Sequence, residues 1–389
     1  MAKHFGRPRH FVPIATGTVV VAALGAGGAA IALRPQPAAS AASGSSGGST
    51  TLAPATTTTT APRLPLQVSA LTPAAGATGV SGASTVVLAT NSPVDTASGL
   101  PTISPAVAGR WNASGDRLVF TPTDAFAPST TYTVTVPAGL RSTAGSPAGA
   151  AHSWSFTTQA GSTLRLQQLL AQLGYLPLNW SPSPGQPAES LARSVFQPPT
   201  GQFSWTWTSP PATLTAAWSQ GQYTVMTKGA VMAFEADHGL TTDGVAGPHV
   251  WAALLAATSS ASPPKNQHGY TYALATKALP ETLRVWHDGT LISTSRANTG
   301  IPQAPTADGT FPVYERLATQ VMKGKNPDGS KYADPVAWVA YFNGGDAIHY
   351  IARAAYGSPQ SLGCVEIPYA VGQHIWPSLT IGTLVTVAG

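Results

Sequence analysis

An uncharged run of 23 residues, from Phe11 to Leu33, limits from the outset where and how this chain can fold. A run of that length can cross a bilayer as a helix, whereas the apolar part of a secretory signal peptide has only about 7–15 residues. Three basic residues and no acidic residue precede the run. By the positive-inside rule this leaves the N-terminus in the cytoplasm and the bulk of the chain outside. We therefore expect residues 1–34 to form a basic N-terminus and a membrane anchor.

A cleaved signal peptide is the alternative, because Ala39-Ser40-Ala41 supplies the small residues of a cleavage site. In either case the remainder of the chain is exported. The protein is then either anchored on the outer side of the membrane or released beyond it.

The net charge of +5 belongs to this N-terminal segment and not to a basic surface. Residues 1–34 contain four basic residues and no acidic one, whereas the chain from His268 to its end contains 8 basic and 8 acidic residues. No basic face remains that could neutralise a phosphate backbone. We therefore expect a membrane partner and no nucleic acid.

Cys364 is the only cysteine in the chain, so an exported protein of this sequence has no internal disulfide. An unpaired thiol outside the cytoplasm is open to oxidation, which favours a function for it, although an inert buried cysteine is the alternative. The nine histidines form no H-E-x-x-H pattern, and no C-x-x-C pattern, P-loop or G-x-G-x-x-G sequence is present. We expect neither a metal site nor a cofactor.

Two segments with different patterns follow the N-terminal run. Residues 35–66 are of low complexity, rich in Ala, Ser, Gly, Thr and Pro, and predict a disordered tether. Residues 67–158 contain short alternating runs separated by turn residues, which predict an antiparallel β-sandwich. The stretches TPAAGATGV and FTPTDAFAPSTTYTVTV resemble bacterial Ig-like domains. We interpret this segment as a spacer, with carbohydrate binding as the alternative.

Helical spacing appears at Leu164–Leu173, Thr227–Asp237 and Pro248–Ala256, which predicts a small three-helix bundle. The sequence TKGAVMAFEADHGLTTDGVAGPHVWAALL resembles the peptidoglycan-binding domain of cell-wall enzymes. The resemblance implies such a domain over residues 163–257, with a purely structural role as the alternative. An insertion at 177–222, rich in Pro, Ser and Trp, interrupts it. Its tryptophans either stack on sugars or, as we prefer, pack within the insertion.

The region 268–389 returns to a β pattern, and two of its segments carry the candidate chemistry: AIHYI, which contains His349, and YGSPQSLGCVE, which contains Cys364. A free thiol has a pKa near 8.5, so a nucleophilic cysteine needs a base beside it, and an imidazole on an adjacent strand can serve. Small residues around a nucleophile let backbone N–H groups approach an oxyanion. The small residues here are Gly357, Ser358, Ser361 and Gly363.

This region resembles the catalytic domain of the L,D-transpeptidases, the YkuD family, in a His on one strand followed by Ser361-Leu362-Gly363-Cys364. The resemblance implies that Cys364 attacks a tetrapeptide stem of peptidoglycan, with His349 as its base, and that an amine of a second stem resolves the thioester into a cross-link. The expected partners are stem peptides, with glycan strands as further candidates. A hydrolase (an L,D-carboxypeptidase) with the same pair, and a non-catalytic wall anchor, remain alternatives.

Three positions depart from the family pattern: Leu362 replaces a His, Tyr350 replaces a Gly or Ser, and Glu366 replaces an Arg. We assign Tyr350, Tyr356 and Glu366 to shaping the substrate site. Glu366 lies two residues after Cys364 and hence on the same face of its strand, where it would raise the thiol pKa if it faces the sulfur. Together these patterns predict a multidomain, mainly β protein of the bacterial cell envelope.

Overall fold

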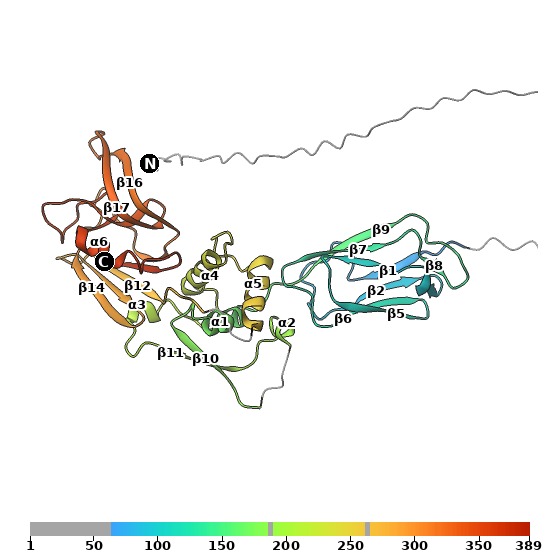
Figure 1. The fold of residues 1–389 in the computed structure, drawn as a ribbon. Coiled ribbons are helices and arrows are strands. Elements are labelled where there is room, and N and C mark those ends of the chain that lie inside the picture. The colour runs from blue at the N-terminus through green and yellow to red at the C-terminus, as the bar shows by residue number, and fades with distance from the viewer. Residues whose placement is uncertain (1–63, 186–189, 261–264) are drawn as a thin grey trace, which may run out of the picture. The chain divides into compact units, whose positions relative to one another are not determined.

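The computed structural model describes residues 64–185, 190–260 and 265–389 (Figure 1). The expected membrane anchor at 1–34 and most of the tether at 35–66 lie outside these residues. Among the residues that are described, no helix is both long and apolar enough to cross a membrane.

The first described segment folds into two β-sheets with a shared core. One sheet has the strand order β1-β2-β6-β5 and the other the order β4-β7-β9, with the short pair β3-β8 beside them. Inward residues of both sheets, such as Leu88, Val134 and Trp154, belong to one buried cluster, as the alternating sequence predicts. The strands are β1 Val68–Thr72, β2 Val86–Thr90, β3 Val94–Asp95, β4 Thr102–Ser104, β5 Gly109–Ser114, β6 Arg117–Pro122, β7 Thr131–Val136, β8 Arg141–Ser142 and β9 His152–Thr157, with a 3-10 turn at Thr96–Ser98.

The middle segment is helical, but it contains more than the three helices that the sequence predicts. The three expected helices are α1 Thr163–Gln172, α4 Val225–Asp237 and α5 Pro248–Ser259. The insertion adds the helices α2 Leu191–Ser194 and α3 Ala212–Thr215, and the hairpin β10 Leu178–Pro182 and β11 Gly201–Trp205. Trp207 is buried in the core of this segment, and Trp180, Trp205 and Trp218 pack against the same core. The tryptophans of the insertion therefore take part in packing, with the helical core as well as within the insertion itself.

Two β-sheets and one helix form the C-terminal segment. The five-stranded sheet has the order β14-β13-β12-β20-β15 and the four-stranded sheet the order β16-β17-β18-β19. Val285 and Val385 of the first sheet and Ile348 and Val365 of the second share one buried cluster, which Ile375 of the helix completes. The elements are β12 Thr271–Thr276, β13 Thr282–His287, β14 Thr290–Arg296, β15 Gly309–Pro312, β16 Glu315–Lys325, β17 Lys331–Asn343, β18 Asp346–Tyr350, β19 Val365–Ile367, α6 Tyr369–Ile375 and β20 Leu384–Ala388.

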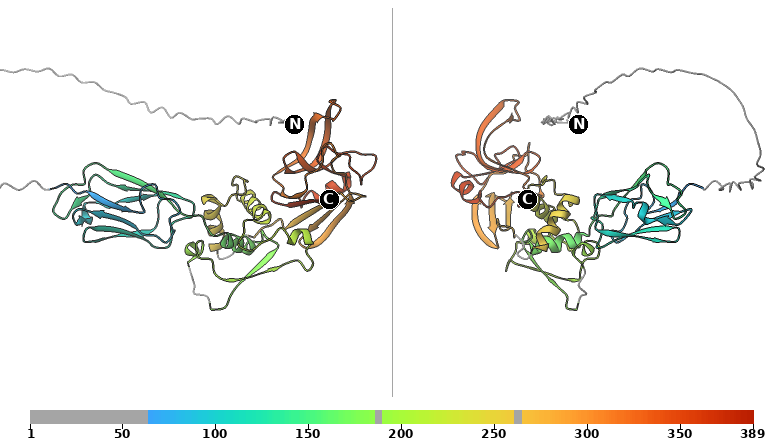
Figure 2. Two further views of the ribbon diagram at one scale, coloured as in Figure 1. Left: turned by 180° about the vertical axis from the view of Figure 1, so that it is seen from behind. Right: turned by 45° about the vertical axis from the view of Figure 1, so that its right-hand side comes forward.

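The strands β16 and β17 form a long hairpin that stands out from this segment (Figures 1 and 2). The sequence predicts only Phe311–Arg316 and Val336–Phe342 as strands here, so the extent of the hairpin differs from the prediction. The outer part of β16 is exposed or half-buried along its length. A strand without a buried face shows no alternation of polar and apolar residues.

Candidate active site

The register of β18 and β19 brings the two candidate catalytic segments together. These strands run parallel, with Ile348 opposite Val365 and His349 opposite Glu366. Ile348 and Val365 point into the core, so alternation directs His349, Glu366 and Cys364 to the other face of the sheet. The imidazole and the thiol thus lie on one face of two adjacent strands, in diagonal positions. Cys364 packs there beside Ala347.

The loop that carries the thiol is held by its own small residues. The Oγ of Ser361 donates to the carbonyl oxygen of Cys364 at 2.6 Å, and the N–H of Gly363 donates to that Oγ at 3.2 Å. Gly363 has a φ of 121°, and a Cβ at this position would lie 2.5 Å from Oδ1 of Asp346. Only glycine fits both the backbone conformation and the space.

Gly357 and Ser358 lie earlier in the same loop, and their backbone N–H groups point to Asn298 and not to the sulfur. Their N–H groups donate to Oδ1 of Asn298, at 2.9 and 3.4 Å, and the side-chain amide of Gln360 donates to the same oxygen at 3.3 Å. Asn298 was not singled out by the sequence, because it lies in the loop after β14 and its partners are distant along the chain.

Glu366 is 2% exposed and is fully engaged in hydrogen bonds. Arg353 binds it with two of its nitrogens, Nε to Oε2 at 2.8 Å and Nη2 to Oε1 at 2.5 Å. The side-chain amide of Asn298 donates to Oε2 at 3.3 Å. Arg353 was not predicted from the sequence, although an acidic residue at a buried strand position implies a cationic partner.

The electrostatics favour the neutral forms of both Cys364 and His349. Burial raises the pKa of the Cys364 thiol to about 12, and the carboxylates of Asp346 and Glu366 act in the same direction, against a hydrogen bond from the backbone of Ala347. The thiol donates to the carbonyl of Gly345 at 3.7 Å. Burial also lowers the pKa of His349, which is 3% exposed. At neutral pH the sulfur therefore carries its proton and the imidazole is free to accept one.

A backbone contact sets the tautomer of His349. Its Nδ1 lies 3.2 Å from the carbonyl oxygen of Tyr350. A carbonyl only accepts, so this contact is a hydrogen bond when Nδ1 carries the proton. The Nε2 atom then keeps its lone pair and can act as a base.

The two tyrosines assigned to substrate shaping have different surroundings. Tyr350 lines a groove of about 520 Å³ whose other walls come from β16, β17 and Ala352, and its ring packs edge-on against Tyr369. The hydroxyl of Tyr356 donates to the carbonyl of Ile351 at 2.5 Å and so closes the loop that follows β18. Tyr350 is thus placed beside a groove, whereas Tyr356 holds the backbone.

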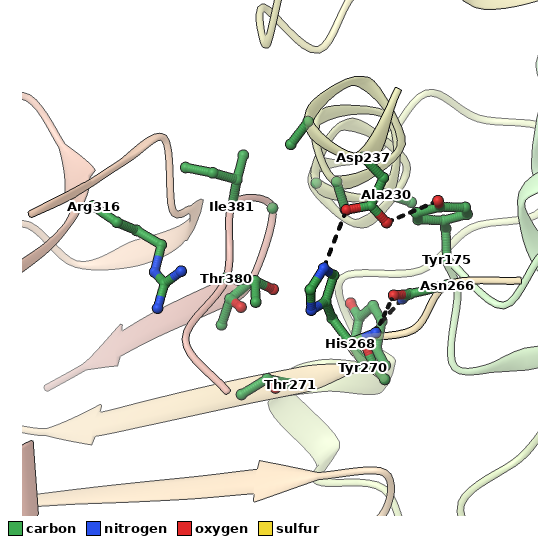
Figure 3. A pocket seen from close by; sticks show the side chains of 16 residues that line it. Tyr175, Ala230, Asp237, Asn266, His268, Tyr270, Thr271, Arg316, Thr380 and Ile381 are labelled. Carbon is green, nitrogen blue, oxygen red and sulfur yellow. Dashed lines mark hydrogen bonds and ion pairs between the residues drawn. The ribbon is translucent and has the colours of Figure 1, made fainter. Parts of the chain in front are cut away.

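A second hollow, of about 160 Å³, is lined by a different set of residues (Figure 3). Its wall includes Asp237 of α4, which is paired with His268 at 3.4 Å and accepts a hydrogen bond from Tyr175 at 2.9 Å. Two polar atoms of other lining residues, the Tyr270 hydroxyl and Arg316 Nε, are shielded from solvent and have no hydrogen-bond partner among the residues that the structure describes. Within the described ranges, no group of three or more His, Cys, Asp or Glu residues is arranged to hold a metal ion.

Three family models match separate parts of the chain. They are the bacterial Ig-like domain at residues 62–158, the peptidoglycan binding domain at 210–254 and the L,D-transpeptidase catalytic domain at 271–387. Among curated protein sequences, none is similar enough to this chain to count as a match.

Several solved structures are similar to the chain. An L,D-transpeptidase from Mycobacterium smegmatis is 15% identical, with 84% of this chain and 100% of that chain covered and a TM-score of 0.29. L,D-transpeptidase 3 from Mycobacterium tuberculosis, in complex with a faropenem-derived adduct, is 13% identical over 83% and 98% of the two chains, with a TM-score of 0.29. The catalytic domain of the Enterococcus faecium L,D-transpeptidase is 26% identical over 31% of this chain and 99% of that chain, with a TM-score of 0.28.

Proposed function

The chain carries an L,D-transpeptidase catalytic domain of the YkuD family together with a peptidoglycan-binding domain and a bacterial Ig-like domain, and we propose that it cross-links peptidoglycan through a thioester on Cys364. The observation that carries the proposal is the register of β18 and β19, which has His349 and Cys364 on one face of adjacent strands. The donor is a tetrapeptide stem, and the acceptor is the side-chain amine of a second stem.

In the first step, the sulfur of Cys364 attacks the carbonyl carbon that joins the third residue of the stem to its terminal D-Ala. The thiol proton passes to Nε2 of His349 as the carbon–sulfur bond forms, because both groups start neutral. The backbone N–H of Cys364 stabilises the oxyanion of the tetrahedral intermediate. His349 then returns the proton to the nitrogen of D-Ala, which leaves, and a thioester remains.

In the second step, an amine of the acceptor stem attacks the thioester carbonyl. His349 takes a proton from that amine and gives it to the departing sulfur, so an amide forms and the thiol is restored. If water takes the place of the amine, the same steps release a shortened stem, and the protein is a carboxypeptidase. The nature of the acceptor thus separates these two activities.

We further propose that the protein works at the cell envelope. The apolar run at Phe11–Leu33 and the basic residues before it support an anchor with the catalytic domain outside the cytoplasm. The low-complexity segment that follows would let the folded domains reach the wall.

A direct test is intact-mass spectrometry of the full-length protein in detergent after incubation with a carbapenem. We expect one adduct on the wild type, none on Cys364→Ala and a strongly slowed reaction for His349→Gln. A wild type that never gains mass would remove the support for catalysis and favour the wall-anchor alternative. Tetrapeptide muropeptides then separate the two reactions, because a transpeptidase yields dimers and a carboxypeptidase yields tripeptide monomers.

A further inference from the structure

We propose that Arg353 is a positioning residue: it neutralises the buried carboxylate of Glu366 beside the catalytic pair and thereby allows the Cys364 thiol to ionise. The inference rests on the proposed function, because it concerns the same thiol and imidazole. It assigns a role to an ion pair that the family resemblance does not contain, since an arginine is expected at position 366.

The geometry of the ion pair links the two catalytic segments. Arg353 lies in the loop just after β18, which carries His349, whereas Glu366 lies in β19, just after Cys364. Two hydrogen bonds, at 2.5 and 2.8 Å, join the guanidinium to the carboxylate. The long loop between the imidazole and the thiol is therefore fastened near both of its ends.

The contacts continue from the carboxylate into the loop that presents the thiol. Asn298 donates to Glu366 through its side-chain nitrogen, and its oxygen accepts from the N–H of Gly357 and from the side chain of Gln360. The backbones of Asn298 and Glu366 also exchange two hydrogen bonds. Glu366 thus helps to hold the loop through Asn298, but this role places a carboxylate close to the sulfur.

A buried carboxylate in this position is unfavourable for catalysis unless a cation accompanies it. Glu366 is 2% exposed, on the face of β19 that carries Cys364 and directly opposite His349. A nearby anion opposes the formation of a thiolate. Arg353 keeps 31% of its side chain exposed and carries the compensating charge to this site.

Other titratable groups around the pair are mostly acidic. The carboxylates of Asp346 in β18 and Glu366 in β19 disfavour ionisation of the thiol, and the phenols of Tyr332, Tyr341 and Tyr314 interact with it electrostatically. The charged groups that act on the imidazole are Glu366, Arg353 and Asp334. Loss of the guanidinium charge therefore leaves the thiolate opposed by two carboxylates.

Neutralisation and simple fastening predict different mutant behaviour. Arg353→Met leaves a buried, unpaired carboxylate, whereas Glu366→Gln leaves a partly exposed guanidinium that water can solvate. If charge is what matters, Arg353→Met is far more harmful than Glu366→Gln, and Arg353→Met/Glu366→Gln recovers the loss. If the bonds only fasten the loop, the two single variants are equally harmful and the double variant is no better.

The experiment measures the rate of Cys364 alkylation by iodoacetamide from pH 5 to 10, on the full-length protein in detergent. This rate reports thiolate formation whether or not the protein is a transpeptidase. Because the thiol pKa lies above this range, the rate rises with pH across all of it. We expect Arg353→Met to be alkylated about tenfold more slowly at pH 8, which displaces its rate–pH curve upward on the pH axis by about one pH unit. Glu366→Gln and the double variant should stay within about threefold of the wild type, with curves at or below the wild-type position on the pH axis.

Equal losses of alkylation rate in Arg353→Met and Glu366→Gln would overturn the proposal. Arg353→Lys keeps the charge without the bidentate contact, so its rate–pH curve should match that of the wild type. This variant gives the answer if Arg353→Met does not fold, and a curve displaced to higher pH would count against neutralisation. Carbapenem acylation run in parallel keeps the two proposals apart. A wild type that is not acylated while its variants show the expected alkylation profiles would defeat the proposed function and leave this inference standing.

Discussion

Ser361 donates a 2.6 Å hydrogen bond to the carbonyl oxygen of Cys364 and accepts one from the N–H of Gly363 at 3.2 Å. One hydroxyl thus fixes the peptide groups on both sides of the Gly363–Cys364 bond. The amide of Cys364, which we assign to the oxyanion, takes its direction from these contacts. A site that depends on pre-aligned donors loses rate when the alignment loosens.

We therefore predict that Ser361→Ala slows acylation of Cys364 by about 10²-fold, which is the size of effect expected for a displaced oxyanion donor. Ser358→Ala is the matched control, because the Ser358 hydroxyl only accepts a bond from Gln360 at 3.1 Å. Rapid-mixing mass spectrometry with a carbapenem gives both rates. Equal rates for the two variants would show that the hydroxyl of Ser361 has no part in aligning the site.

The pH dependence of acylation follows from the state of His349. Burial lowers the pKa of this imidazole from its ordinary value, so the ring remains neutral, and able to accept a proton, in acid where an exposed histidine would be protonated. We predict that the acidic limb of the acylation rate falls below pH ~6.5, the ordinary histidine value. A pH–rate profile with a carbapenem measures it, and His349→Gln should lack this limb. A limb near or above pH 7 would contradict a buried neutral base.

Gly363 is predicted to tolerate no side chain. Gly363→Ala combines a left-handed backbone, which costs about 1–2 kcal/mol, with a contact of 2.5 Å to Asp346, for which overpacking adds about 1–3 kcal/mol. Gly329→Ala is the matched control, since Gly329 has a φ of 86° and no atom within 4 Å of its would-be Cβ. Thermal unfolding should show a clear loss for Gly363→Ala and a smaller one for the control, and acylation should fail only in the former.

Much of the fold follows from local pattern. The strands β7 and β13 are examples, because each alternates buried residues with more exposed ones, and a turn at Asp288-Gly289 follows β13. The hairpin of β16 and β17 was underestimated for the opposite reason: its outer half has no buried face. The insertion likewise showed no periodicity from which its own hairpin could be predicted.

Two residues of the candidate site, Cys364 and His349, were predicted from residue type and family resemblance. Arg353 and Asn298 were not predicted, because their importance comes from contacts across the fold. Asn298 and Glu366 are adjacent in space through a bridge between loop and strand that no spacing along the chain reveals. The acidic residue at position 366 indicated a charge that would oppose a thiolate. The cation that neutralises it, Arg353, lies 13 residues earlier in the chain, and the structure was needed to identify it.

Glu235 of α4 leads to a prediction about stability outside the catalytic domain. It is 1% exposed, and its Oε2 accepts from the N–H of Gly244 at 2.8 Å. Burial raises its pKa to about 7, and the nearby carboxylate of Asp243 acts in the same direction. The folded protein thus favours the protonated form. This stabilisation is complete below the unfolded pKa of about 4.3 and is lost as the pH rises toward 7.

We predict that Glu235→Gln removes the loss of stability that the wild type suffers as the pH rises toward 7, because glutamine keeps the acceptor for Gly244 and carries no charge. The stability of the variant relative to the wild type should increase between pH 4 and pH 8 by an amount on the order of 2–4 kcal/mol and then level off. Thermal unfolding across this pH range, followed through the transition of the helical segment, measures the difference. If wild type and variant keep a constant gap at every pH, the pKa of Glu235 is the same in the folded and the unfolded protein, and burial does not raise it.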